Sequence, residues 1–528
     1  YVGVESIQQF EERFEARRER YAFGTTNILS YLDLGDATTA TNRGYVWQDY
    51  TLWSQFGQLN YDYDGKYLAQ VILRNDSSSR FQQASRSAFF PAFSLGWRMS
   101  DEKFMDNVTW IDNLKLRYGW GKTGNQQIGD YNAYTTYRSD ILTGGYPIDG
   151  STGSPQIGFA PRAFGNPNAK WEATTSNNLG MDLVMLDNKL SINLDVWKRV
   201  TTDMLINVPV TYTAGQADEP AFNVGQMTNK GIDLGISYGD KKGDFSYEVS
   251  ANISTYTNNV DALEGESTRI FGQSRRIPAL SITEAGSPLS SFYGFKTLGI
   301  FQSQAEADAW APYGDYNAPG KFRIADINND GEINDDDRTI IGSPHPDFTY
   351  GININLSYKN LDLNIFGNGS QGNDVFNYVR YFADFNTFQG NRSRRALYDA
   401  WQPTNPTADP STWVAANPGA TSPIMDANDQ ISSRPSSYLI EDGSFFRLKN
   451  IQLTYNFPEK IISTIGLDRA QVDVQAQNIA TFTKYTGLNP EVQLSNADDS
   501  RRNLTLGYDG GSQPVAKTIS LGLNVTLK

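Results

Sequence analysis

The feature that most constrains this chain is an alternation of apolar and polar residues, repeated in segments that short turns connect. Residues 190–196 read Leu-Ser-Ile-Asn-Leu-Asp-Val, and residues 178–185 alternate in the same way. A period of two places every second side chain on one face of a β-strand. The Asp187-Asn188 step between these segments is a turn signal, so the sequence predicts a β-hairpin here.

The same pattern recurs along the chain and predicts about 14 strands, a number within the range of membrane barrels. Further examples of these alternating segments are residues 58–63, 67–73, 232–238, 245–253, 352–358, 361–365, 451–457, 472–476 and 519–527.

Apolar stretches are too short for membrane-spanning helices, because none approaches the roughly 18–20 residues that such a helix needs. A barrel of strands avoids this requirement, since its strands satisfy their backbone groups with one another. A soluble β-sandwich or propeller is the alternative interpretation. Up to about five alternating apolar positions per strand, a strongly polar opposite face and very unequal connections favour the barrel. We therefore expect an all-β fold, a transmembrane antiparallel β-barrel with long extracellular loops.

Long polar connections rich in Gly, Pro, Asn and Asp separate the hairpins, and on a barrel they become extracellular loops. The densely charged run Glu11–Arg20 lies in the first connection, where we expect a solvated face or a short helix. The connections are predicted near residues 11–45, 125–168, 203–225, 260–346, 375–440 and 484–513.

Composition removes several classes of function. The 528 residues include no cysteine, which excludes disulfides, cysteine–zinc sites and thiol nucleophiles. A net charge of -14 argues against nucleic acid as a partner. Tyr1 opens the sequence without a methionine or a secretory leader, so we expect a truncated or incompletely read chain rather than a processed one.

Residues 326–337 fit the spacing of an EF-hand-like calcium loop. Gly331 stands at the sixth position, where the chain must turn sharply, and the twelfth position carries Asp in place of the usual Glu. The alternative is an Asp- and Asn-rich turn without a metal. We expect a bound Ca²⁺ to be structural, with the ligands Asp326, Asn328, Asp330, Glu332 (through its carbonyl) and Asp337.

No catalytic constellation emerges from the other motifs, so we expect no enzyme. Gly119, Gly121 and Gly124 match a dinucleotide fingerprint, but no βαβ pattern surrounds them. His345 is the sole histidine and lies between two prolines, which favours a structural role. Loop aromatics offer faces for sugar rings, although packing within the loops is the more ordinary role. These aromatics are Trp310, Tyr313, Tyr378 and Tyr381.

Polar and aromatic motifs in order over almost the whole chain resemble the C-terminal barrel region of SusC/RagA-type TonB-dependent transporters of Bacteroidetes. The longest of these motifs are residues 90–104, Phe-Pro-Ala-Phe-Ser-Leu-Gly-Trp-Arg-Met-Ser-Asp-Glu-Lys-Phe, and residues 114–126. The others are residues 73–81, 166–172, 229–231, 292–295, 326–337, 346–351, 447–451, 476–478 and 485–490.

The resemblance implies a barrel of roughly 22 strands around an N-terminal plug, of which residues 1–528 would supply about 14 strands. The plug, the early strands and the TonB-contacting segment would then lie outside this sequence. Residues 260–346 would form a long extracellular loop region that contains the calcium loop 326–337.

The resemblance also implies a function and partners. The function would be import of oligosaccharides or peptides across the outer membrane of a Gram-negative cell, energised by TonB-ExbB-ExbD. The partners would be a SusD-like lipoprotein over the extracellular mouth and the surrounding outer-membrane lipid and LPS. Two alternatives remain open, a passive porin of about 14–16 strands and a surface calcium-binding β-rich adhesin.

Overall fold

A computed structural model gives the fold and describes residues 1–21, 31–139, 144–148, 150, 156–208, 217–263, 268–272, 276–277, 279–385, 390–492 and 503–527. Its main element is one antiparallel sheet of 14 strands, in which each strand pairs with the next one along the chain. The all-β prediction is therefore confirmed. The strands are β1 (Val2–Arg17), β2 (Thr41–Tyr63), β3 (Tyr67–Ser78), β4 (Ser87–Arg98), β5 (Ile111–Asn125), β10 (Glu172–Met185), β11 (Leu190–Thr202), β14 (Gly225–Lys242), β15 (Phe245–Leu263), β22 (Phe348–Tyr358), β23 (Leu361–Gln371), β26 (Phe445–Asn456), β27 (Leu467–Thr483) and β29 (Thr518–Leu527).

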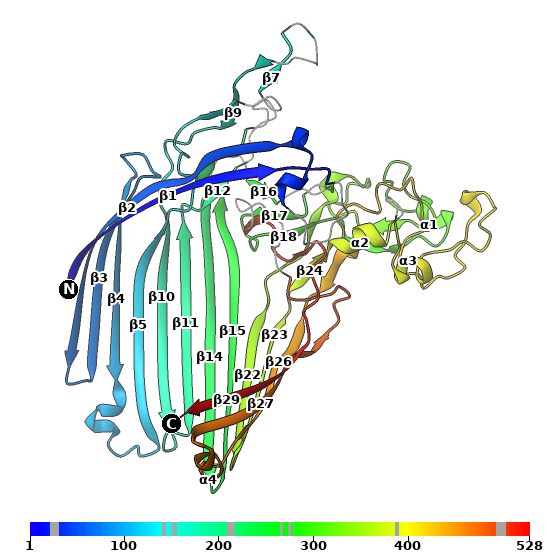
Figure 1. Ribbon diagram of the computed structural model, residues 1–528. Coiled ribbons are helices and arrows are strands. Elements are labelled where there is room, and N and C mark those ends of the chain that lie inside the picture. Colours follow the sequence, from blue (N-terminus) through cyan, green and yellow to red (C-terminus); the bar gives the residue numbers. More distant parts are fainter. Residues whose placement is uncertain are drawn as a thin grey trace.

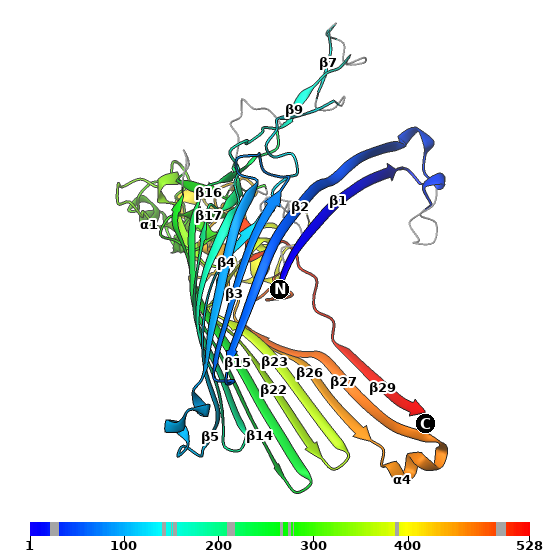
Figure 2. The same cartoon turned by 90° about the vertical axis from the view of Figure 1, so that its left-hand side faces the viewer.

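The sheet is strongly curved and forms a wall that does not close on itself (Figures 1 and 2). Within the described residues, β1 pairs only with β2 and β29 pairs only with β27, so these two strands are its free edges. A porin closed by these 14 strands alone is not the observed arrangement.

Short turns connect the strands at one end of the wall. The predicted hairpin between β10 and β11 is present, and its turn residues Asp187 and Asn188 have φ values of 58° and 62°. Asp and Asn accept this left-handed conformation more readily than most residues do. Near the same end, helix α4 (Glu459–Ile462) lies between β26 and β27.

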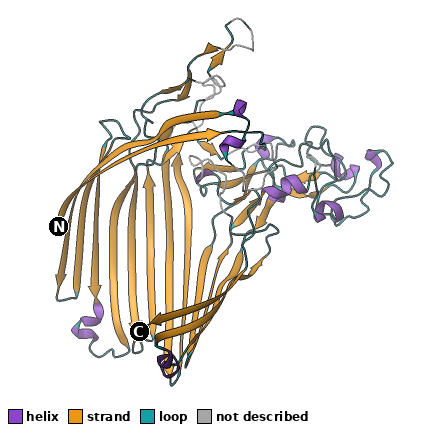
Figure 3. Cartoon of the chain, viewed as in Figure 1, coloured by secondary structure: helices purple, strands orange, loops and turns teal. Residues whose placement is uncertain are grey.

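Long connections leave the opposite end of the wall, and most of them fold together into a compact body that we call the loop cap (Figure 3). The cap comprises the described parts of residues 264–347, 372–444 and 484–517. Its strands are β16 (Arg269–Phe271), β17 (Ser281–Glu284), β18 (Ser291–Gly294), β19 (Thr297–Ile300), β20 (Phe322–Ile324), β21 (Thr339–Gly342), β24 (Asp374–Asn377), β25 (Ile440–Asp442) and β28 (Tyr508–Asp509), and its α-helices are α1 (Gln304–Asp308), α2 (Tyr378–Ala383) and α3 (Arg394–Tyr398).

The connection between β5 and β10 leaves the wall as an arm that rises well above it (Figure 1). Two short pairs of strands build the arm. They are β6 (Thr136–Arg138) with β9 (Ala160–Ala163) and β7 (Gly145–Tyr146) with β8 (Gln156–Ile157), while β12 (Leu205–Asn207) pairs with β13 (Ala221–Asn223) at its base.

One local prediction was wrong. The run Glu11–Arg20 is not a helix, because residues up to Arg17 continue β1 and pair with β2. Cross-strand partners explain why a charged segment stays extended here: Glu15 pairs with Arg43 at 2.5 Å, and the Arg13 guanidinium lies 3.6 Å from the Trp47 ring centroid. The predicted solvated face is therefore a two-stranded ribbon.

In the described part of the chain, helices are all short, and none has the length and apolar character needed to cross a bilayer.

Candidate functional site

The wall has two chemically different faces, as the alternating pattern predicts. Leu179 pairs with Val196 on one face, and Asp182 pairs with Asn193 on the other. On the first face large apolar side chains stay exposed, with Leu179 60% and Leu59 69% accessible. Such exposure is costly in water and favourable against lipid. We call the first face the lipid face and the second the lumen face.

Aromatic residues on the lipid face mark the two edges of the apolar band. Near the short turns, the rings of Tyr238 and Tyr247 lie 6.0 Å apart. Towards the long loops, Tyr350 stacks on Phe446 at 5.9 Å. Tyr350 and Tyr358 on β22 are eight residues apart, about 27 Å along the strand and about 20 Å in height at a tilt of roughly 35–45°, slightly less than an apolar band of about 25 Å.

An ion network joins three strands on the lumen face. Arg117 on β5 donates two hydrogen bonds to Asp182 on β10, at 2.8 and 2.9 Å, and one to Asp195 on β11 at 3.2 Å. Gly180 makes this approach possible, since a Cβ there would lie 2.7 Å from Arg117 Cζ and 2.6 Å from Asp195 Oδ1. Asn193 donates to Asp182 at 3.0 Å, so the network is tightly connected.

A second cation holds the first three strands together. Arg74 on β3 contacts Asp76 at 2.7 Å, Glu5 on β1 at 3.0 Å and Ser54 on β2 at 2.8 Å. Together with Arg117, it makes the lumen face from β1 to β11 a charged surface held by cross-strand ion pairs.

The lumen face from β22 to β27 is built differently, from uncharged amides. Asn364 donates to Asn353 at 2.9 Å and to Asn355 at 2.7 Å. Asn450 donates to Asn364 at 3.0 Å, and Gln475 donates to Asn450 at 2.7 Å. We call this chain of hydrogen bonds across four strands the amide ladder. It leaves a wall that offers neutral donors and acceptors to a polar solute.

The loop cap has an ordinary buried core. Phe376 is fully buried and Phe292 is 1% exposed, and their ring centroids lie 6.0 Å apart. The aromatics Tyr378 and Tyr381 belong to this core, each 6% exposed, with their rings stacked at 5.1 Å. Tyr313 packs against the same core, while Trp310 donates to the Ile324 carbonyl at 2.7 Å. The ordinary packing role therefore accounts for all four loop aromatics.

Buried polar groups fix the cap and attach it to the wall. Arg447 on β26, 2% exposed, donates to Asn489 at 2.7 Å and pairs with Glu491 at 2.5 Å. Within the cap, Arg380 pairs with Asp384 at 3.0 Å and lies over the Tyr438 ring at 3.9 Å. Breaking such buried pairs is expensive, so Arg447 ties residues 489 and 491 of the cap to the wall.

His345 joins the cap to β15, and its surroundings match the expected structural role. Its ring contacts the Tyr256 hydroxyl at 3.2 Å through Nδ1 and the Leu289 carbonyl at 2.8 Å through Nε2. Burial lowers the pKa of His345, against the opposing effect of the Leu289 carbonyl. The neutral ring therefore acts as a hydrogen-bonding link.

The predicted calcium loop lies on the surface of the cap, with Ile333 inserted into the core. Gly331 has a φ of 87° and donates its N–H to Asp326 Oδ2 at 3.0 Å, as a sharp turn at that position requires. Asp337 is fully buried and accepts from the backbone N–H groups of Ile327 and Asn334, both at 2.8 Å.

Two observations bear on whether this loop suits a cation. Asp326 Oδ1 is buried without a hydrogen-bond partner, which suits a group that waits for a ligand. Among the residues that the structure describes, no three or more acidic or histidine side chains already surround one point. Asn328, Asp330 and Glu332 are exposed residues of the turn. Calcium binding here stays a prediction.

The remaining glycine motif is structural. Gly119, Gly121 and Gly124 all lie within strand β5, so they form no phosphate-binding turn. The lumen residues Arg117, Arg74 and Arg447 were not singled out from the sequence. In the sequence, each of these arginines is a cation at a polar position of an alternating strand. The sequence does not show which side chains each arginine contacts.

Three comparisons with known proteins give consistent results. Residues 3–368 match the family model of the TonB dependent receptor-like β-barrel. TonB-dependent receptor P3 of Formosa agariphila is 32% identical over 506 residues, covering 95% of this chain and 48% of that protein. TonB-dependent receptor SusC of Bacteroides thetaiotaomicron is 29% identical over 489 residues, covering 90% and 44%.

A solved structure supports the same architecture. The structure titled as the RagAB peptide transporter superposes with a TM-score of 0.78 at 26% identity, over 99% of this chain and 52% of that one. The chain thus spans about half the length of the relatives that it matches.

Proposed function

The chain belongs to the TonB-dependent receptor family of outer-membrane β-barrels, and from that premise we propose that it forms the larger part of the barrel of an active nutrient importer. The cargo class that we propose is oligosaccharide or peptide, taken up from outside the cell. The long-loop end of the wall then faces the exterior and the short turns face the periplasm. The relatives are receptors and transporters rather than enzymes.

The observation that carries this proposal is the pairing of a lipid-facing apolar surface with a hydrogen-bonded polar lumen face. The amide ladder around Asn364 presents neutral hydrogen-bonding groups. Hydroxyls of a glycan and amides of a peptide both exchange hydrogen bonds with such groups. A wall of this kind suits passage of large polar solutes without binding them tightly.

Energy coupling is assigned to the part of the protein outside this sequence. We propose that the remaining half supplies the strands that close the gap between β1 and β29. It would also supply a plug within the lumen and the segment that contacts TonB, with ExbB and ExbD as the energy source. The open edges of the sheet support this division.

The extracellular partner that we propose is a SusD-like lipoprotein lid. The arm supports it, since it rises above the wall (Figure 1) and carries several large aromatic or aliphatic side chains that are more than half exposed. Large exposed apolar groups beyond the membrane favour contact with another protein. These side chains are Tyr134, Tyr137, Tyr146, Ile148, Ile157 and Phe159, between 52% and 79% exposed.

The test is uptake by cells that carry or lack the full-length protein. We expect uptake of a fluorescent oligosaccharide or peptide to require the protein and to stop when the inner-membrane proton gradient is dissipated. Uptake that continues at the same rate without the gradient would mean passive diffusion and would favour the porin alternative.

We also propose one structural Ca²⁺ in the loop 326–337. The ligands would be Asp326, Asn328, Asp330, the Glu332 carbonyl and Asp337, and the ion would stiffen the cap surface. The left-handed Gly331 and the unpartnered Asp326 Oδ1 support this proposal.

A further inference from the structure

Two lysines lie side by side on the lipid face of the wall. Lys198 on β11 and Lys230 on β14 are direct cross-strand neighbours in the register of these strands. They occupy the same face as Val196 and Ile232, which are 46% and 44% exposed. Side chains at such paired positions lie about 5 Å apart, and like charges placed there repel. The pair therefore carries a repulsion that a bound anion would relieve.

The height of this lysine pair coincides with the outer edge of the apolar band. Lys230 is eight residues from Tyr238 along β14, the same separation as that between Tyr350 and Tyr358 on β22. Because Tyr238 lies near the periplasmic turns, Lys230 lies about 27 Å farther along the tilted strand, towards the outer edge of the apolar band where the lipid headgroups of the outer leaflet begin.

Other charges around the pair leave the cluster with a net positive charge. Lys122 on β5 faces the same side. It is two residues from Trp120, which lies in the same cross-strand row as Lys198. Asp261 is the acidic neighbour of Lys198 and attracts it, while its carboxylate also accepts from Thr228 at 2.6 Å, so one negative charge faces three lysines. Within the described residues, Lys198 and Lys230 form no ion pair or hydrogen bond through their ammonium groups.

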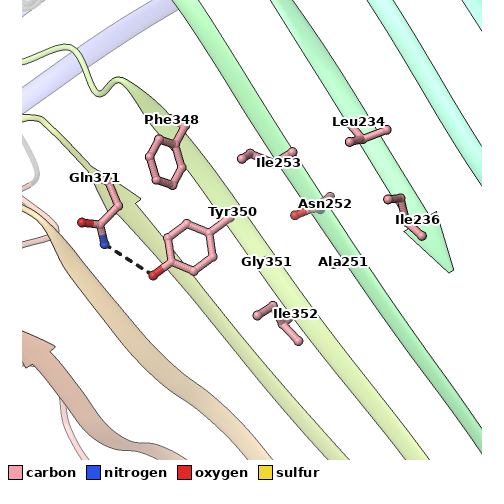
Figure 4. A pocket seen from close by; sticks show the side chains of 10 residues that line it. All are labelled: Leu234, Ile236, Ala251, Asn252, Ile253, Phe348, Tyr350, Gly351, Ile352 and Gln371. Carbon is pink, nitrogen blue, oxygen red and sulfur yellow. Dashed lines mark hydrogen bonds between the residues drawn. The ribbon is translucent and has the colours of Figure 1, made fainter. Parts of the chain in front are cut away.

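An apolar hollow lies below the lysines on the same face, between β14, β15 and β22 (Figure 4). It measures about 410 Å³ and exists because Ala251 is small where its neighbours Ile236, Ile253 and Ile352 are large. Ile232 lies between Lys230 and the hollow on β14. From Lys230 to Ile236 is about 20 Å along the strand, within reach of a fatty acyl chain.

We propose that Lys198 and Lys230 bind the phosphate of a phosphorylated glycolipid of the outer leaflet, with one of its acyl chains seated in the hollow at Ala251. Two ammonium groups on adjacent strands bracket one phosphate, which removes their mutual repulsion. The hollow gives the apolar part of the same molecule a fixed position. Lipid binding would anchor the extracellular half of the wall at β11–β15, directly below the loop cap.

This inference rests on the outer-membrane orientation in the proposed function, but its test is independent of transport. The full-length protein is extracted in mild detergent, and the bound lipid is counted by native mass spectrometry. Delipidated protein is then titrated with purified lipid A, with the same lipid after removal of its phosphates, and with inorganic phosphate. The variants are K198Q/K230Q and the control K241Q/K242Q, which makes the same charge change at the periplasmic end of β14.

We expect wild-type protein to retain the phosphorylated lipid and K198Q/K230Q to bind it about thirtyfold more weakly, at roughly fivefold per lysine. K241Q/K242Q should match wild type, and A251F should weaken lipid A binding by filling the hollow.

Equal binding of lipid A by wild type and K198Q/K230Q would overturn the proposal. So would wild-type protein that binds the dephosphorylated lipid as strongly as it binds lipid A. Equally strong binding of inorganic phosphate would show a site for the free ion and would also overturn it. If cells that carry the wild-type protein take up no oligosaccharide or peptide while that protein still retains the lipid, the result would count against the proposed function alone.

Discussion

The wall and the loop cap follow opposite rules of stability. The wall leaves its large apolar side chains exposed, as at Leu179, and it is held by backbone pairing between strands. The cap buries its aromatic residues, as at Phe376, as a soluble domain does. One chain thus folds for two solvents, lipid around the wall and water around the cap. Substitutions of the same kind should therefore have different effects in the two regions.

The largest expected effect is in the cap core. Phe376→Ala removes a fully buried ring and should cost about 3–5 kcal/mol in the unfolding free energy of the cap. Leu179→Ala on the lipid face leaves no enclosed cavity, so it should cost only the transfer free energy of three carbon atoms, about 2 kcal/mol. Denaturant unfolding of the full-length protein measures both, followed by tryptophan fluorescence for the cap variant and by the β-sheet circular dichroism signal for the wall variant. Equal costs would contradict the contrast between the regions.

Within the wall, two glycines of the lumen face form a matched pair. Gly180→Ala places a methyl group against Arg117 and Asp195 and should cost about 1–3 kcal/mol by disrupting their ion pair. Gly235→Ala is the control, because the nearest atom to its new Cβ lies 3.9 Å away. Thermal unfolding in detergent should separate the two variants, and a harmless Gly180→Ala would show that the network contributes little.

The alternation predicted the wall well because its cause is local. A period of two at residues 190–196 specifies a strand and both of its faces, and Asp187-Asn188 specifies the hairpin turn. Pairing of each strand with the next in sequence then fixes the register. The charged Glu11–Arg17 segment was missed because its partners Arg43 and Trp47 lie across the sheet.

The cap was not predictable in the same way. Phe292, Phe376 and Tyr508 come from three separate connections and meet only in the folded core. No periodic pattern joins them, so the sequence suggested loops where the structure has a domain-like body. The calcium motif is the exception, because its residues are consecutive and their spacing carries the chemistry.

Calcium should stabilise the cap and leave the wall unchanged. At a hundredfold excess over its dissociation constant, one bound Ca²⁺ adds about 2.7 kcal/mol to the unfolding free energy. We expect the cap transition to shift on adding Ca²⁺, and the shift to vanish in Asp326→Ala. Asp315→Ala, a change of the same charge elsewhere in the cap, should keep it. A shift of the same size in Asp326→Ala would reject the site.

The smallest effect concerns pH. Burial raises the pKa of Asp374 in the cap, helped by the nearby Asp442 and Asp347 and opposed by the Ser343 N–H. Protons bind more tightly in the folded state, so this group favours the cap as pH falls from its raised pKa towards the unfolded value of 3.8. Asp374→Asn should slightly raise the unfolding temperature at neutral pH and flatten its pH dependence.

Asp442→Asn is the matched control for that change. Hydrogen bonds from Ser444 lower the pKa of Asp442, so its charged form stabilises the cap at neutral pH and that stability is lost on acidification. Asp442→Asn should therefore lower the unfolding temperature at pH 7. The same sign of change in both variants would contradict these pKa directions.

The most direct test of the two-faced wall is a cysteine scan of β11, made possible by the absence of cysteine from these 528 residues. Spin labels are placed singly at residues 190–196 of the full-length protein in bilayers, with any cysteine outside these residues first replaced. The account predicts high oxygen accessibility at 190, 192, 194 and 196 and low accessibility at 191, 193 and 195. A profile without this alternation would contradict it.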